Sequence, residues 1–165
     1  MEVLPTIGFA GLFLGFCLLA ALYDVAELRI PNWLTGAMAI AAPLAVGLLG
    51  PGFSAVPIAL LTGAVVLAVT WAMFEMNWLG GGDAKLAAAA ALWLGPHASL
   101  VFVLATALFG AVLAALLLML SRWNAARALV GGRWRERLEA EAISVPYAVA
   151  MAPAGAVAMS AALLN

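Results

Sequence analysis

The chain has 165 residues, of which 67% are hydrophobic and 9% are charged. An ordinary soluble domain carries about 25% charged residues, so this composition excludes such a domain and indicates an integral membrane protein. The net charge of −1 argues against nucleic acid binding, and the single cysteine, Cys17, excludes a disulfide framework and a CxxC metal site.

Six apolar runs follow one another along the chain. In order, they cover residues 6–23, 33–50, 54–74, 86–94, 98–120 and 144–164. A helix needs about 20 apolar residues to cross a hydrocarbon core of about 30 Å, and the run at 33–50 is slightly short of this. The run at 86–94 is much shorter, and a helix from Asp83 to Gly95 would cover only roughly 18 Å. The sequence therefore predicts an all-α integral membrane protein, a polytopic bundle of six transmembrane segments with a short fourth, in a single domain over 1–165.

The basic residues predict the orientation of this bundle. All of them lie in the first, third and fifth connections: Arg29, Lys85, Arg122, Arg127, Arg133, Arg135 and Arg137. Basic loops face the cytoplasm. We therefore expect cytoplasmic loops at 24–32, 75–85 and 121–143, with both termini on the outer side of the membrane.

The loop at 121–143 is rich in arginine and tryptophan. One interpretation places it at the headgroup level, with arginines toward anionic lipid and tryptophans in the interface. The other is that it only fixes the orientation of the chain.

Two acidic residues stand at the ends of apolar runs on the same predicted side. Asp24 ends the first run, where a helix carboxy terminus disfavours a negative charge, and its simplest role is an interfacial ion pair with Arg29. Asp83 precedes the short fourth run, where aspartate is a favoured helix N-cap. A carboxylate at membrane depth is costly and is by default a functional hypothesis.

The residues around these aspartates carry further expectations. Capping does not explain Gly80, Gly81 and Gly82, because consecutive glycines are used where the backbone bends sharply or approaches another group closely. We expect Lys85 to snorkel to the interface. Pro31 and Asn32 should begin the second helix, with Asn32 as its cap.

Two aspartates held close together have a specific chemistry. Both cannot ionise, so they share a proton, and one can activate water while the other polarises a carbonyl. This hydrolyses a peptide without a metal, a cofactor or a covalent intermediate. The motifs HExxH and GxSxG are missing from the sequence, as is any Cys/His pairing on one side of the membrane.

Three stretches resemble the motifs of the prepilin peptidase family. "YDVAELRIPNWLT" resembles its D-x-x-x-x-R-I-P-N stretch, and "GGGDAKL" resembles its G-x-G-D-x-K-L motif. "VPYAVAMAPAG", at 145–155, resembles the P-Y motif that opens its last span. The resemblance implies a GxGD-type intramembrane aspartyl endopeptidase of the bacterial inner membrane. Such enzymes remove the short, positively charged leader of type IV prepilins or pseudopilins on the cytoplasmic side, after a glycine and before the hydrophobic segment.

Carried over motif by motif, the resemblance makes Asp24 and Asp83 the catalytic pair. Gly80 and Gly82 match the motif glycines. Four further motif residues have no specified role: Arg29, Pro31, Asn32 and Lys85. The implied partners are prepilin substrates and membrane lipid, with no metal ligand and no cofactor.

The chain is similar to the short form of the family associated with tight-adherence (Flp-type) pili. Larger members have an amino-terminal region with paired CxxC motifs and also methylate the new pilin terminus. This chain begins almost directly with its first apolar run and has one cysteine. N-methylation is therefore not expected.

Four alternatives remain open. An ion-coupled transporter would use the membrane carboxylates, although the spans offer few other polar residues than Thr62, Thr70, Thr106 and Ser160. A non-catalytic subunit of a pilus or secretion machine would tolerate loss of either aspartate. A metal-dependent enzyme would add Glu27 and Glu75 to a carboxylate cluster. A related intramembrane aspartyl protease, of the preflagellin or signal-peptide type, is a near neighbour.

Overall fold

The structure is a computed structural model that describes residues 3–27, 29–122 and 147–164. Its elements are α1 (Val3–Glu27), α2 (Asn32–Leu48), the short 3-10 turn η1 (Phe53–Ala55), α3 (Val56–Glu75), α4 (Gly81–Arg122) and α7 (Tyr147–Leu164). These ranges contain helices and turns and no strand. The all-α prediction is confirmed for the part of the chain that the structure describes.

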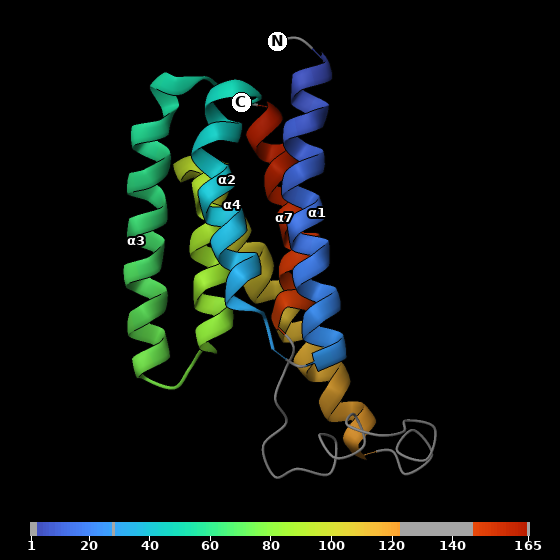
Figure 1. Ribbon diagram of the computed structural model, residues 1–165. Coiled ribbons are helices and arrows are strands. Elements are labelled where there is room, and N and C mark those ends of the chain that lie inside the picture. The colour runs from blue at the N-terminus through green and yellow to red at the C-terminus, as the bar shows by residue number, and fades with distance from the viewer. Residues whose placement is uncertain (1–2, 28, 123–146, 165) are drawn as a thin grey trace.

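Helix α4 doubles back on itself at Gly95. Its 42 residues would measure about 63 Å if straight, roughly twice the thickness of a hydrocarbon core. Gly95 has φ 68° and ψ 179°, a conformation that glycine adopts without a Cβ clash, and Pro96 cannot donate a helical hydrogen bond. Figure 1 shows the two halves of α4 running in opposite directions.

Within the described ranges, four helices are long and apolar enough to cross a membrane, namely α1, α3, α4 and α7, and α2 is a shorter apolar helix. The sequence predicted separate crossings for the two runs that α4 contains. The break at Gly95 lies where the short fourth run was expected to end. Six separate crossings stay a prediction.

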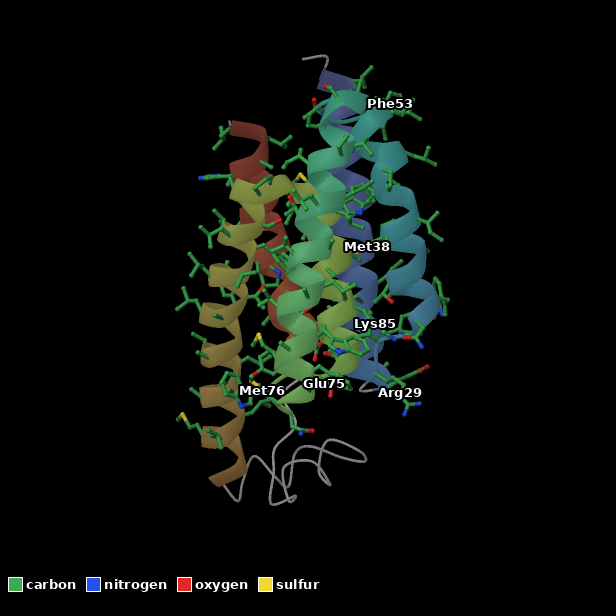
Figure 2. All side chains as sticks on the ribbon, turned by 90° about the vertical axis from the view of Figure 1, so that its left-hand side faces the viewer. Arg29, Met38, Phe53, Glu75, Met76 and Lys85 are labelled. Atoms are coloured by element: carbon green, nitrogen blue, oxygen red, sulfur yellow. The ribbon has the colours of Figure 1, made fainter. Side chains whose placement is uncertain are left out.

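The connections alternate between the two ends of the bundle. Arg29, Glu75 and Lys85 lie at one end and Phe53 lies at the other (Figure 2). The Gly50-Pro51 turn, the Pro96-His97 turn and Ala162 line one common pocket, so these turns meet the end of α7. The two basic connections that the structure describes therefore share an end, while the assignment of that end to the cytoplasm stays a prediction.

Trp93 on α4 is buried and contacts both α1 and α2. Its Nε1 donates a buried hydrogen bond of 3.0 Å to the carbonyl of Met38 on α2. The ring centroids of Phe9, Phe13 and Phe16 on α1 lie 5.4, 6.0 and 6.1 Å from the centroid of the indole ring. A buried indole combines a large apolar area with a polar group that needs a partner, and both requirements are met here.

Helix α7 packs closely on α1 through small residues. A Cβ on Gly155 would lie 3.2 Å from Cys17 Sγ and 3.2 Å from the ring of Phe13. Ala154 and Ala158 beside it are fully buried. Close approach of small residues is the usual basis of helix association in membranes. Cys17 is therefore a packing residue.

We predict that Trp93→Phe lowers the free energy of unfolding in detergent by about 1–3 kcal/mol, because it removes a buried hydrogen bond and part of the ring packing. Trp71→Phe is the matched control, since Trp71 is 53% exposed. The control should change stability by less than about 0.5 kcal/mol. Equal effects of the two substitutions would contradict the central role of Trp93.

Candidate active site

Asp24 lies in the last two turns of α1 and is buried, with 6% of its surface exposed. Its Oδ2 accepts a hydrogen bond of 3.1 Å from the backbone N–H of Ala148, which is 124 positions away in the first turn of α7. The first N–H groups of a helix have no partner within the helix, and negative charge is favourable there. Asp24 therefore holds the start of α7 against the end of α1.

This contact changes the structural interpretation of Asp24. The sequence suggested an interfacial charge that pairs with Arg29, whereas the structure shows that Asp24 is buried and that Arg29 is exposed. One partner of Asp24 is a backbone N–H group from the other end of the chain, and the pairing with Arg29 stays a prediction.

Asp83 is the third residue of α4 and is half-buried. The expectation that it caps this helix is wrong, because α4 already begins at Gly81 and the carbonyl of Gly80 accepts the N–H of Ala84 at 3.0 Å. The carboxylate still lies in the first turn, where the helix dipole favours a negative charge.

The two carboxylates lie within electrostatic range of one another. Asp24 acts on Asp83 electrostatically, across the junction between the end of α1 and the start of α4. Both elements lie at the end of the bundle that carries Lys85 and Glu75 (Figures 1 and 2).

The glycines before Asp83 serve close packing. Among the described residues, the glycines with positive φ are Gly52 and Gly95, so Gly80, Gly81 and Gly82 do not use the left-handed conformation that glycine allows. A Cβ on Gly80 would lie 2.7 Å from Oδ2 of Asp83. A Cβ on Gly82 would lie 3.3 Å from Cβ of Ile30. The sequence analysis gave two reasons for consecutive glycines, a sharp bend or close approach to another group, and the structure shows the close approach.

The contact between Gly82 and Ile30 joins the two motifs that the sequence analysis singled out. Ile30 is 6% exposed and directly precedes Pro31, while Gly82 directly precedes Asp83. The start of α4 is thereby pressed against the segment that follows α1.

A second bridge between the motifs is a hydrogen bond from Lys85 Nζ to Asn32 Oδ1, 2.9 Å long. Both side chains are exposed. Asn32 was expected to cap α2, but the N-cap is Pro31, with φ −65° and ψ 137° and no side-chain cap hydrogen bond. Lys85 was expected only to snorkel; its ammonium reaches the exposed end of the bundle and binds α2 there.

The other charged residues described at this end of the bundle lie on the surface. Arg29, Glu27 and Glu75 are exposed. Within the described ranges, no three His, Cys, Asp or Glu side chains come together. The predicted basic loop at 121–143 lies outside the described residues, apart from the last helical positions of α4.

Three contacts of the site were missed by sequence reasoning. The sequence did contain a signal for Ile30, because this residue is part of the R-I-P-N stretch. It contained no signal for the N–H of Ala148, because every residue except proline has such a group. Thr70 was noted only as a polar residue in a span, yet its Oγ1, which donates to Val66 within α3 at 2.8 Å, also lies 3.3 Å from the carbonyl of Ala84 in the first turn of α4.

Comparison with known proteins gives one match. The model of a family described as the type IV leader peptidase family matches residues 11–115, which is more than half of the chain and includes both aspartates. No curated protein and no solved structure matches the chain.

The bridge between Lys85 and Asn32 predicts an energetic coupling. In a double-mutant cycle of Lys85→Ala and Asn32→Ala, we expect a coupling of about 0.5–1 kcal/mol in unfolding free energy, because both groups are exposed to solvent. A cycle of Lys85→Ala with Glu27→Ala, an exposed residue of α1, is the control and should show coupling near zero. The same near-zero value in both cycles would contradict the bridge.

Proposed function

Because the chain belongs to the type IV leader peptidase family, we propose that it is an intramembrane aspartyl endopeptidase with Asp24 and Asp83 as its catalytic pair. Its substrates would be type IV prepilins, cut at the cytoplasmic face of the bacterial inner membrane. On the motif resemblance we place these among the prepilins of tight-adherence (Flp-type) pili. The six crossings and the outer position of both termini belong to the same proposal.

One observation carries the assignment of the pair: two carboxylates from distant parts of the chain act on one another in a largely buried site. Like charges in such a site favour a shared proton. The site then holds a base and an acid at the same time, which general acid–base hydrolysis requires.

The reaction would proceed in two steps. The ionised aspartate takes a proton from water while the water oxygen bonds to the scissile carbonyl carbon, and the protonated aspartate gives its proton to the carbonyl oxygen. In the second step the C–N bond breaks as the nitrogen takes the proton first removed from water. A hydroxyl of the intermediate returns its proton to the other aspartate, so the products are an amine and a carboxylic acid and the pair is regenerated.

The surroundings of the pair support this chemistry. Asp24 has one oxygen held by the N–H of Ala148, so its orientation is set by α7. Asp83 has Gly80 directly beside its Oδ2, where any larger residue would displace the carboxylate.

We expect Asp24→Asn and Asp83→Asn each to lower prepilin cleavage by about 10²–10⁴-fold or more, since each removes an acid–base group. Asparagine keeps an oxygen that can accept the N–H of Ala148, so the Asp24 variant should stay folded and inserted. Cleavage is measured by the gel shift of a co-expressed prepilin. Glu75→Gln, which changes an exposed carboxylate, is the matched control and should cleave normally.

Near-normal cleavage by either asparagine variant would refute the pair. Such a result in both variants would favour a non-catalytic subunit. Strong inhibition of the wild type by a chelator would favour a metal-dependent enzyme.

Gly80→Ala tests the position of the Asp83 carboxylate. The new methyl group would force Oδ2 to move, which a side-chain rotation allows at small expense in stability, but a displacement of about 1 Å can lower the rate by about 10²-fold. Gly81→Ala is the control, since its Cβ would meet the ring of Phe74 at 3.2 Å, away from Asp83. Equal cleavage by the two alanine variants would contradict the assigned role of Gly80.

A further inference from the structure

A cavity of about 350 Å³ lies between the end of α3, both halves of α4 and the start of α7. Its lining is mostly apolar and includes Phe102, Val103 and Met151. Helices α4 and α7, whose first turns belong to the candidate active site, both contribute to its wall. It occupies the same end of the bundle as Trp78 and Leu79, which precede the glycines of the site.

Two residues in the wall of the cavity are close in sequence to the aspartate site. Ala87, in its wall, is one helical turn beyond Asp83 on the same face of α4. Tyr147, also in its wall, directly precedes Ala148, whose N–H binds Asp24. A peptide whose scissile bond lies at the aspartates would therefore place its neighbouring residue at this cavity.

One polar group in the wall lacks a partner. The Oγ1 atom of Thr106 is buried and forms no hydrogen bond with any residue that the structure describes. By contrast, the hydroxyls of Thr62 and Thr70 donate to carbonyls within α3. Buried hydroxyls in folded proteins nearly always have a partner, so Thr106 is suited to a group supplied from outside the chain.

We propose that this cavity binds the apolar side chain that directly follows the scissile bond of the substrate, with the hydroxyl of Thr106 hydrogen-bonded to the substrate backbone. The inference rests on the proposed peptidase function and adds to it the place where the first residue of the mature product is held. The volume of the cavity lies at the lower end of the range of about 300–1,000 Å³ for small-ligand pockets. It suits one or two large side chains and is too small for a whole helix.

Ala111→Phe tests the cavity because Ala111 lines it and is exposed, so the larger ring fills the space without overpacking the core. Three prepilins are compared that carry Phe, Leu or Ala directly after the scissile bond. The variant should lose at least about tenfold in kcat/KM on the Phe and Leu substrates, as expected when a hydrophobic pocket loses room for several methylene groups. It should cleave the Ala substrate as the wild type does, which also shows that it is folded.

Ala115→Phe is the matched control, one turn further along α4, exposed and outside the cavity. It should treat all three substrates as the wild type does. The proposal would be overturned if Ala111→Phe kept the wild-type order of preference among the three substrates, whether it was fully active or uniformly slowed. A uniform loss would indicate that the cavity holds a lipid chain or is a structural void. Failure of the wild type to cleave any of the three would refute the peptidase function instead.

Thr106→Val gives an independent check of the hydrogen bond. It should lower kcat/KM on all three substrates by about threefold to tenfold, since one hydrogen bond to the common backbone is lost. Unchanged rates would remove Thr106 from the proposal.

Discussion

The contact of Gly82 with Ile30 is the constraint on which the candidate site depends. It places the first turn of α4 against the segment that follows α1, and so it brings Asp83 into the electrostatic field of Asp24. A side chain at position 82 would meet the Cβ of Ile30, an atom that cannot rotate away. The hydrogen bond between Lys85 and Asn32 reinforces the same junction from its exposed side.

The third support of the site comes from the other end of the chain. Asp24 binds the N–H of Ala148, so the first turn of α7 is fixed beside the aspartates. The buried carboxylate gains a hydrogen bond, and the helix terminus gains a negative charge at its positive end. One interaction thus serves both the fold and the orientation of a candidate catalytic group.

The packing follows the requirements of a lipid-exposed bundle. Small residues such as Ala154 and Gly155 lie between the helices, whereas Leu4 and Ile40 are 83% and 76% exposed. In a bilayer, apolar side chains on the outside are solvated by lipid, and close contact between helices depends on small residues. Large side chains such as Phe13 and Trp93 are also buried between the helices, and the N–H of Trp93 is bound by α2.

The sequence by itself determined the helical class, the approximate helix limits, the break at Gly95 and the family, because apolar length, Pro/Gly pairs and short motifs are local properties. It also identified Asp24 and Asp83 as candidates. Only the tertiary structure decided that Asp24 binds α7, that Asn32 binds Lys85 and does not cap α2, and that the glycines at 80–82 give room to neighbouring groups. These features depend on which atoms meet across helices far apart in the chain, and local propensity carries no information about such contacts.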